Sequence, residues 1–504
     1  QSLFNINAFP KSIKKDSQNS QLTSLYRTIY DKNYTYLQYW RGPNMEYVYG
    51  SRKEAGGATG VDLERRQLIN ITEQYDKKIW SSSKPNAEAI WQHLPSNSNS
   101  WTNTPSYEGI KIPEHLQDKL NEPLEGDDKA GEILSVEGAL NAFHLPKGYK
   151  ISLYASEQDF PLANPMAMNF DSKGRLWVAN TPTWPHPKPG VQPEDFIVIL
   201  EDSDKNGKAD KHTIFMDKLN MIHGFALGFD GVFISQTPNI IFAKDTNGDN
   251  VADSVETIMQ GFGAEDAEHS INNLTWGPDG GLYFLNGIFF HSQIETPYGP
   301  VRLKDAGVFR YEPRLQKLDT YLSDFFWNPW GLAFDQTGQG ILLDASSGDF
   351  YNMKPMAANF NYPKIKYSCC TPNDGPQDHP IHELLSFAPD GVGPAAGIGI
   401  IQNSHFPKEA QRRFVSNQIE GWRGTHWFDM TEKGTNFELK QLAQELIFSE
   451  DKHFRPVAMN FGPDGALYIL DFYSPIFENV DFPKRTKGRD HSHGRIWRIT
   501  YPSK

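Results

Sequence analysis

From residue 148 onward, the chain alternates short apolar runs with turns that are built on Asp and Gly. Five segments repeat one phrase, in which an apolar run leads through an aromatic residue and a turn into a second apolar run. The phrases begin at Asn164, His223, Ser270, Asn328 and Arg455, and their aromatics are Phe170, Phe229, Trp276, Phe334 and Phe461. Glycine accepts the positive φ that such a turn demands, so each phrase predicts a pair of antiparallel strands.

The spacing of the phrases predicts the number of units in the fold. The first three intervals are about 50 to 60 residues, which is a typical repeat length for propeller blades. The last interval is about twice as long. A degenerate copy at residues 393–401 fills the double gap and brings the units to six. We therefore expect an all-β, six-bladed β-propeller. Residues 494–501 are expected to pair with residues 150–156 and close the ring, so that no sheet edge stays open.

Residues 1–133 carry none of this pattern. Apolar residues recur at helical spacing from Leu68 to Ile79 and predict one amphipathic helix. A polar stretch with Gly and Pro at residues 123–132 predicts a linker. We expect residues 1–133 to form a loop-rich, partly helical extension that packs on a propeller domain at residues 134–504. The alternative is that the extension is a lid or a partner-docking arm.

The repeat also aligns one polar position of each unit. The aligned residues, six positions before each anchoring aromatic, are Asn164, His223, Ser270 (with His269 beside it), Asn328 and Arg455. Equivalent positions of propeller blades lie in a ring, so these side chains are expected to converge at one mouth of the central channel. A polar cluster in a concave mouth favours a functional site. The alternative is that these residues only hydrogen-bond the loops between blades.

Two segments rich in Asp and Asn have the alternate spacing of calcium loops. The oxygen-bearing residues of the two segments are Asp245, Asn247, Asp249, Asp253 and Glu256 in one, and Asp202, Asp204, Asn206 and Asp210 in the other. The segment at residues 202–213 has Thr213 where the last carboxylate should stand. Because Ca²⁺ prefers oxygen ligands, we expect structural calcium in at least one segment, with residues 245–256 favoured. The alternative is a pair of metal-free hairpin turns.

Composition restricts the partners. The chain has a net charge of −13 and carries no basic stripe that would neutralise phosphates, so nucleic acid is not expected as a partner. No apolar run approaches the ~18 residues that span a bilayer, so no transmembrane segment is expected. The two cysteines, Cys369 and Cys370, are adjacent, which excludes a CxxC motif and leaves either a vicinal disulfide or two buried thiols.

Several motifs of residues 134–504 carry a family resemblance. They read EDSDKNGKADK, DTNGDNVAD, HSINNLTWGPDGGLYF, ETPYGPVRL, NPWGLAFD, FRPVAMNFGPDGALYILDFYSPI and RDHSHGRIWRITY. With these motifs the chain resembles the sorbosone and soluble glucose dehydrogenase propellers, and more closely the membrane-bound dehydrogenase family of planctomycete-type bacteria. The resemblance implies an extracytoplasmic oxidoreductase, periplasmic or on the outer cell surface, that acts on a sugar or polyol. It also implies pyrroloquinoline quinone, calcium and a separate electron acceptor of the cytochrome c type.

The resemblance further implies roles for single residues. His269 matches the histidine that accepts the proton of the sugar hydroxyl while hydride passes to the quinone, and a neutral imidazole suits that role. Asn328 matches an asparagine of the cofactor pocket. Arg423 and Arg455, with His223, are the other candidates for cofactor binding. Residues 344–349 fall where the family holds its cofactor-associated calcium.

Two residues depart from the family pattern. Trp327 stands where an arginine would contact the quinone, and Glu268 replaces the aspartate that precedes the histidine. The missing arginine and the additional N-terminal region favour an alternative function. In that alternative, the propeller is non-catalytic and serves as a binding or scaffold subunit that joins other cell-surface proteins.

Two further groups are candidates for ligand contact. Trp184 and His186, and the run from Phe289 to His291, follow predicted inner strands and would suit stacking on sugar rings if they are exposed. If they are buried, they belong to the core. The cluster at residues 489–495 contains two histidines at alternate positions, which would bind a metal or an anion, or else cap the final strand.

Overall fold

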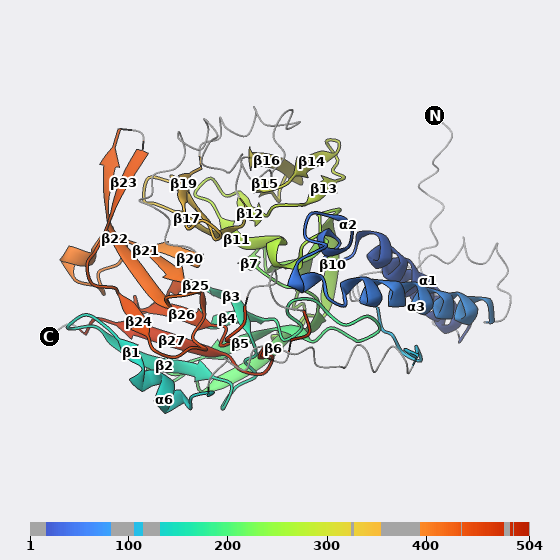
Figure 1. The fold of residues 1–504 in the computed structure, drawn as a ribbon, viewed down its shortest axis with the longest axis horizontal. Coiled ribbons are helices and arrows are strands. Elements are labelled where there is room, and N and C mark those ends of the chain that lie inside the picture. Colours follow the sequence, from blue (N-terminus) through green and yellow to red (C-terminus); the bar gives the residue numbers. More distant parts are fainter. Residues whose placement is uncertain are drawn as a thin grey trace.

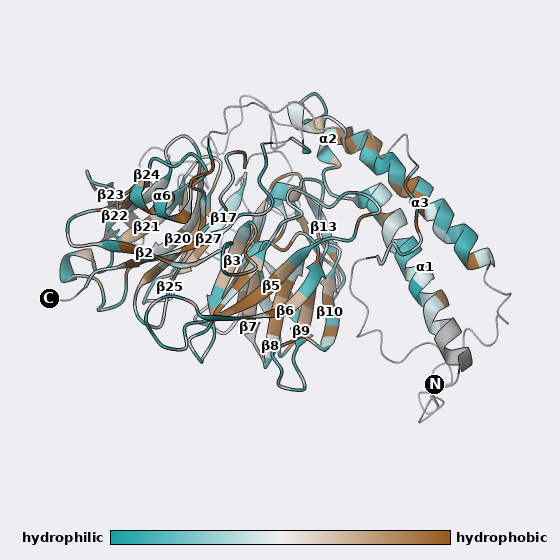
Figure 2. Cartoon of the chain, turned by 90° about the horizontal axis from the view of Figure 1, so that it is seen from below, coloured by the Kyte–Doolittle hydropathy of each residue, from teal (hydrophilic) through white to brown (hydrophobic). Residues whose placement is uncertain are grey.

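The computed structural model describes residues 17–81, 105–113, 132–323, 327–353, 394–434, 436–477, 484–486 and 488–502. Cys369 and Cys370 lie outside the described residues, as do residues 123–131 of the predicted linker. In the described part, strands are grouped into blades and two long helices lie at one side of them (Figure 1). The strands are largely apolar and many of the connecting turns are hydrophilic (Figure 2), as the alternating pattern predicts.

The first three blades follow one another along the chain. Blade one contains β3 (Pro165–Phe170), β4 (Leu176–Asn180), β5 (Asp195–Glu201) and β6 (Lys211–Leu219). Blade two contains β7 (Phe225–Gly228), β8 (Gly231–Gln236), β9 (Asn239–Lys244) and β10 (Ser254–Gln260). Blade three contains β11 (Asn272–Trp276), β12 (Leu282–Asn286), β15 (Gly307–Glu312) and β16 (Lys317–Ser323), with β13 (His291–Ile294) and β14 (Val301–Lys304) as an inserted hairpin.

The last three blades complete the ring. The described strands of blade four are β17 (Pro329–Phe334), β18 (Gly340–Asp344) and β19 (Phe350–Asn352). Blade five contains β20 (Ala395–Ile400), β21 (Phe414–Gln418), β22 (Gly424–Lys433), β23 (Asn436–Gln441) and β24 (Ile447–Ser449), and β1 (Phe143–His144) pairs with β24. Blade six contains β25 (Pro456–Phe461), β26 (Leu467–Asp471), β27 (Arg495–Thr500) and β2 (Lys150–Ser156).

The closure of the ring is confirmed. Strand β2 pairs antiparallel with β27, from Lys150 opposite Thr500 to Ser156 opposite Arg495. The six inner strands β3, β7, β11, β17, β20 and β25 each contact the next, and β25 contacts β3. The degenerate phrase at residues 393–401 does form an inner strand, β20. The chain is therefore a six-bladed β-propeller with an N-terminal helical extension.

Each blade buries both of its faces. In β5, Val198 and Leu200 enter the core between blades six and one, whereas Ile197 and Ile199 enter the core between blades one and two. Successive side chains of a strand point to opposite faces, so one strand supplies two cores. Six such apolar clusters occur among the described residues, one at each junction between neighbouring blades.

The N-terminal extension is more helical than the sequence predicted. It contains α1 (Ser17–Arg41), α2 (Glu46–Tyr49), the 3-10 helix η2 (Gly56–Ala58) and α3 (Val61–Ser81), and α1 packs on α3. The predicted helix from Leu68 to Ile79 is confirmed as part of α3. Helix α1 was missed because its buried positions include the polar Asp31, Thr35 and Gln38, so no apolar stripe marks it. The short α6 (Val136–Asn141) leads into the propeller.

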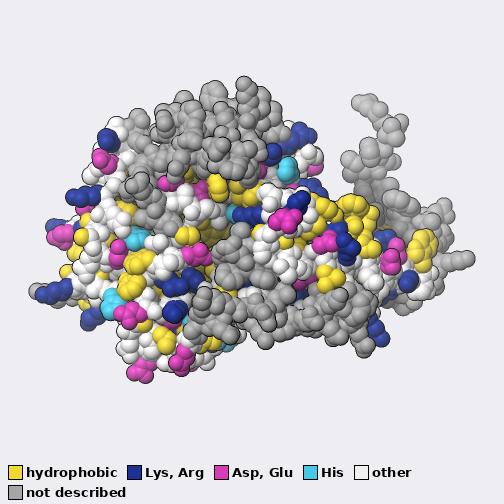
Figure 3. All heavy atoms as spheres, viewed as in Figure 1, with side chains coloured by type: hydrophobic (Ala, Val, Ile, Leu, Met, Phe, Trp, Pro, Cys, Tyr) yellow, Lys and Arg dark blue, Asp and Glu magenta, His cyan; other side chains and the backbone are white. Residues whose placement is uncertain are grey.

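The described surface carries mixed charge. On the face drawn in Figure 3, Lys and Arg side chains lie among Asp and Glu side chains and form no broad patch of one sign in the described part. None of the helices that the structure describes is long and apolar enough to cross a membrane.

Candidate functional site

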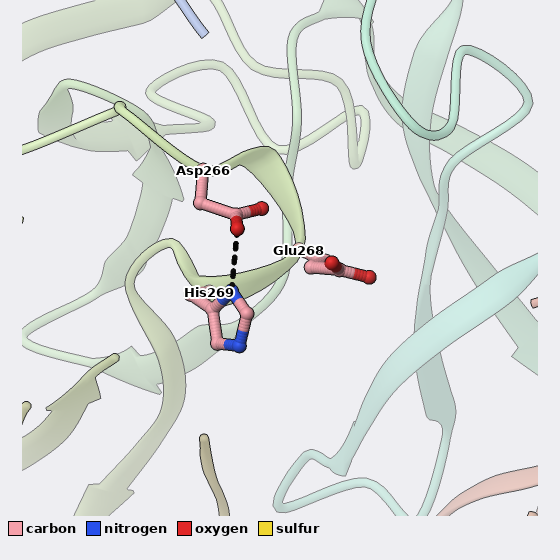
Figure 4. A group of neighbouring side chains, drawn as sticks. All are labelled: Asp266, Glu268 and His269. Carbon is pink, nitrogen blue, oxygen red and sulfur yellow. Dashed lines mark ion pairs between the residues drawn. The ribbon is translucent and has the colours of Figure 1, made fainter. Parts of the chain in front are cut away.

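His269 ends a short 3-10 helix, η5 (Ala267–His269), two residues short of the inner strand β11. Its side chain is 3% exposed, and its Nδ1 lies 3.2 Å from Oδ2 of Asp266. The two side chains point toward each other, whereas Glu268 points away from the pair (Figure 4). Gly287 closes the other side, because a Cβ there would come within 2.6 Å of the His269 Cβ. His269 thus lies between the Asp266 carboxylate and the backbone of Gly287, which follows β12.

The N-terminal extension reaches this pair through Arg52. One guanidinium nitrogen, Nη1, lies 2.5 Å from Asp266 Oδ2 and 3.0 Å from Glu268 Oε1. The same nitrogen donates to the Tyr47 hydroxyl at 3.0 Å, and the guanidinium lies over the ring of Phe289. Burial alone would raise the pKa of Asp266, but His269 and Arg52 together hold it well below its usual range.

Lys484 supplies a second cation to the cluster. Its Nζ lies 3.7 Å from the centre of the Tyr47 ring, and the residue is 1% exposed. Burial lowers the pKa of Lys484 to about 7, although Glu268 and Asp266 oppose the shift. Buried groups with strongly shifted pKa values are concentrated at functional sites, and here such a lysine lies beside a buried His–Asp pair, so this cluster is a candidate site.

Asp266, Glu268 and His269 are also the one set of three acidic, His or Cys side chains, among the described residues, whose ligand atoms lie within 4.8 Å of one another. Arg52 already stands between the two carboxylates. Since the guanidinium supplies the positive charge that a metal ion would bring, we interpret the set as an ion-pair network and not as a metal site.

The aligned polar residues stand just before the inner strands. Asn164, Asn328 and Arg455 each precede an inner strand by one residue, and His223 pairs with the first residue of β11. The channel itself is a cavity of about 380 Å³ that residues of all six inner strands line. Of the aligned polar residues only His223 lines this cavity, whereas Asn164, Ser270, Asn328 and Arg455, like His269, are not among its lining residues.

His223 is held in an aromatic setting. Its Nδ1 lies 2.6 Å from the Ser270 hydroxyl, and its ring lies 5.1 Å from the ring of Trp184 and 5.5 Å from that of Trp330. Burial lowers the pKa of His223 to about 3, so the side chain is neutral at physiological pH. His223 Nε2 has no hydrogen-bond partner in the described part of the chain.

The two arginines predicted to contact a cofactor differ. Arg455 is buried and donates to the backbone carbonyls of Ser474, Ile419 and Pro475. Arg423 is only half-buried, and its Nε has no hydrogen-bond partner among the described residues. The interpretation that aligned polar residues hold loops therefore fits Arg455, whereas Arg423 keeps a donor for a ligand.

Asp344 organises the entry into blade four. Its carboxylate accepts from the backbone N–H groups of Trp327, Asn328 and Ser346 at 2.6, 3.2 and 3.0 Å. Burial raises the pKa of Asp344 despite these hydrogen bonds. Asn328 keeps its side-chain Oδ1 buried without a partner in the described residues. The side chain of Asn328 is thus placed at the mouth by Asp344 and left available there.

The two predicted calcium loops have the same conformation. They connect β5 to β6 and β9 to β10, which are equivalent hairpins of blades one and two. The first aspartate of each loop, Asp202 or Asp245, accepts hydrogen bonds from backbone N–H groups of its own loop. The last aspartate, Asp210 or Asp253, accepts a hydrogen bond from the N–H group of the residue after the first one. Calcium in these loops stays a prediction.

A second contact holds the extension on blade one. Glu64 of α3 accepts from Arg485 at 2.7 and 2.8 Å and lies 2.7 Å from His186 Nε2. Asn44 lies 2.8 Å from the other nitrogen of His186 and accepts from Ala267 N–H at 3.0 Å. His186 is therefore part of an interface and not a platform for a sugar ring.

Most of the remaining candidates are structural, although His291 is exposed and Phe289 is half-buried. Trp184 and Phe290 are 3% and 0% exposed, so they belong to the core. In the 489–495 cluster, His493 Nδ1 lies 2.7 Å from Asp490 Oδ2, and Arg495 pairs with Glu157 at 3.2 Å. These contacts fit the interpretation that the cluster caps the final strand.

Sequence reasoning missed four residues of the cluster, namely Asp266, Tyr47, Arg52 and Lys484. Asp266 had a usable signal, because it stands three residues before His269 and a short helical turn brings such a pair together. Tyr47, Arg52 and Lys484 had none, since each is distant from His269 in sequence and carries no motif.

The family model described as "Domain of unknown function (DUF7133)" matches residues 135–503, which is nearly the whole propeller. No curated protein matches the chain.

Solved structures with a similar fold include three sugar-oxidising or carbohydrate-active proteins. The holo form of the pyranose dehydrogenase PQQ domain from Coprinopsis cinerea is 12% identical, with 71% of this chain and 97% of that chain covered and a TM-score of 0.48. A calcium structure of a Trichoderma reesei carbohydrate-active enzyme of family AA12 is 12% identical, covering 72% and 97%, with a TM-score of 0.46. The PQQ-bound aldose sugar dehydrogenase from Streptomyces coelicolor is 13% identical, covering 71% and 100%, with a TM-score of 0.43. With TM-scores below 0.5, these likenesses assign no role to any residue of this chain.

The buried histidines make stability depend on pH. Burial lowers the pKa of His186 to about 4 and that of His223 to about 3. The unfolded chain binds these protons near the ordinary histidine value and the folded chain does not, so the free energy of unfolding should fall as the pH drops from 7 to 5. Each histidine contributes about 1–2 kcal/mol to that fall.

Chemical denaturation at several pH values measures this slope. His223→Gln should flatten it, whereas His144→Gln, at an exposed position, should leave it unchanged. A stability that is constant between pH 7 and pH 5 would contradict the assignment of neutral buried histidines.

Calcium binding to the loop at residues 245–256 predicts a ligand-dependent melting temperature. At a Ca²⁺ concentration 100 times the dissociation constant, the folded state gains about 2.7 kcal/mol. Asp249→Asn should abolish the rise seen by calorimetry, and Asp230→Asn, in the β7–β8 turn, should retain it. Equal melting temperatures in calcium and in a chelator would show that the loops are metal-free turns.

Proposed function

We propose that this chain, which belongs to the DUF7133 family, is an extracytoplasmic oxidoreductase of the sugar dehydrogenase type. In this proposal it acts on a sugar or polyol hydroxyl, or on an aldehyde, in the periplasm or at the outer cell surface. The observation that carries the proposal is the buried pair of His269 and Asp266 at the start of an inner strand. The family resemblance of the surrounding motifs supports the substrate class and the location.

The pair is arranged for general-base catalysis. Asp266 faces Nδ1 of His269, so a neutral imidazole would carry its proton on Nδ1 and leave Nε2 as the acceptor. Nε2 would then take the proton of the substrate hydroxyl as the carbon is oxidised. The negative charge of Asp266 would stabilise the imidazolium that forms, which is the role of the carboxylate in comparable pairs.

The mouth offers polar groups for pyrroloquinoline quinone. His223 Nε2, Asn328 Oδ1 and Arg423 Nε have no hydrogen-bond partner within the described residues. Unsatisfied polar atoms of this kind are costly unless water or a ligand meets them, so the residues fit a polar cofactor. When bound, the quinone would accept the hydride, and a separate acceptor of the cytochrome c type would remove the electrons.

A second function is favoured by two observations. Trp327 occupies the position of the arginine that would contact the quinone, and Arg455 is anchored to backbone carbonyls. A propeller without cofactor contacts would serve as a non-catalytic binding or scaffold subunit of a cell-surface assembly.

Reconstitution with pyrroloquinoline quinone and Ca²⁺ separates the two functions. The wild-type protein should bind the quinone and reduce a dye with an aldose or polyol from a substrate panel. His269→Gln should keep quinone binding and lose at least about 100-fold in turnover, because a general base contributes a factor of this size. His212→Gln, on the exposed outer strand β6, is the matched control and should behave as wild type. If the protein shows no quinone binding and no turnover with any substrate of the panel, the non-catalytic function is supported.

A further inference from the structure

We propose that the N-terminal extension is a working part of the His269 site and that Arg52 is a positioning residue for the Asp266–His269 pair. This inference deepens the proposed function and rests on it for its effect on turnover. Its structural content, which is that Arg52 fixes the carboxylate opposite His269, is independent of the reaction.

One carboxylate oxygen carries the arrangement. Asp266 Oδ2 lies 2.5 Å from Arg52 Nη1 and 3.2 Å from His269 Nδ1, so the same oxygen faces both residues. The contact with His269 is one of ion-pair distance without hydrogen-bond geometry, so the carboxylate must keep its position for the pair to form. Asp266 is completely buried, and its Oδ1 has no hydrogen-bond partner among the described residues. Arg52 therefore decides which oxygen faces the imidazole and from which direction.

Arg52 is itself fixed on several sides. Its Nη1 also contacts Glu268 Oε1 and the Tyr47 hydroxyl, each at 3.0 Å. Its guanidinium carbon lies 4.8 Å from the ring centre of Phe289 and 5.7 Å from that of Tyr47. A planar guanidinium held between rings and carboxylates keeps one orientation, which a flexible lysine would not reproduce.

The backbone of the extension sets the position of Arg52. Asn44 N–H donates to the carbonyl of Ala264 at 3.1 Å, and Glu46 N–H donates to that of Glu265 at 2.9 Å. The Asn44 side chain accepts from Ala267 N–H at 3.0 Å. Residues 44–46 thus run along the segment that carries Asp266, and α2 then brings the chain round to Arg52.

Charge balance gives the contact its consequence. The ionisable groups around His269 are Asp266, Glu268, Arg52, Tyr47 and Lys484, with Arg489 close to Lys484. Without Arg52, the buried Asp266 and the partly buried Glu268 would share Lys484, and Asp266 would be free to rotate toward it. Partners that orient metal-ligating histidines are worth roughly 10- to 100-fold, and we expect an effect of the same order for a partner that orients the Asp266–His269 pair.

The test combines kinetics with the tautomer of His269. The full chain is labelled with ¹⁵N-histidine, and the His269 signals are identified by their loss in His269→Gln. In wild type, at a pH where the imidazole is neutral, the proton should lie on Nδ1 alone. Arg52→Gln should show a mixture of both tautomers, and its kcat should fall about 10- to 100-fold with little change in KM. Arg52→Lys should restore part of each effect.

Arg41→Gln is the matched control. Arg41 also joins the extension to the propeller, by donating to the His291 carbonyl at 2.9 Å, but it does not contact the pair. This variant should keep the wild-type tautomer and turnover, and its melting temperature monitors the loss of a docking contact.

The outcomes are separable. A single Nδ1–H tautomer in folded Arg52→Gln would overturn the positioning role, whatever the activity. Equal changes in Arg41→Gln and Arg52→Gln would also overturn it, because they would show that any loosening of the extension has the same result. A shifted tautomer in a protein without turnover toward any substrate would uphold the positioning role while the proposed reaction fails.

Discussion

The pairing of β2 with β27 is the constraint on which the rest of the structure depends. Every blade has two apolar faces, as β5 shows by sending alternate residues into different cores. A single blade would expose both of its apolar faces to water, and an open row of blades would expose one apolar face at each end. Closing the ring with a strand from the other end of the domain covers all of them and removes the open edge. Closure also fixes where each inner strand begins.

Because the inner strands begin at one mouth, the residues before them stand at equivalent positions of the ring, and one of them, His223, lines the channel cavity. The backbone there is held by buried carboxylates, among them Asp344, which accepts the N–H groups of Trp327 and Asn328. This leaves some side-chain atoms, including His223 Nε2 and Asn328 Oδ1, without partners in the described part of the chain. The extension then reaches the blade-three side of the same mouth and adds Arg52 to the Asp266–His269 pair.

Local chemistry was enough to predict the blades. Asp-Gly turns between apolar runs marked the hairpins, and their spacing gave six units, including the weak copy that became β20. The position of His269 before an inner strand followed from the same register. The partners of His269 did not follow, because Arg52 lies 214 residues from Asp266 and an ion pair leaves no periodicity in the sequence. Helix α1 was not predicted for a related reason. Its buried face carries Asp31 and Thr35, whereas the prediction of a helix relied on an apolar stripe. Charges and hydrogen bonds between distant segments determine the partners of His269 and the packing of α1, and the hydrophobic pattern of the sequence does not predict such interactions.

The central claim is that the extension and blade three form one unit around His269. Hydrogen–deuterium exchange of the full chain, followed by mass spectrometry, measures this directly, since amides in one cooperative unit open together. Peptides that contain residues 43–52 should exchange as slowly as peptides that contain residues 263–272, because N–H groups of Asn44, Glu46 and Ala267 are bonded across the junction. Fast exchange at residues 43–52 with slow exchange at residues 263–272 would contradict the account.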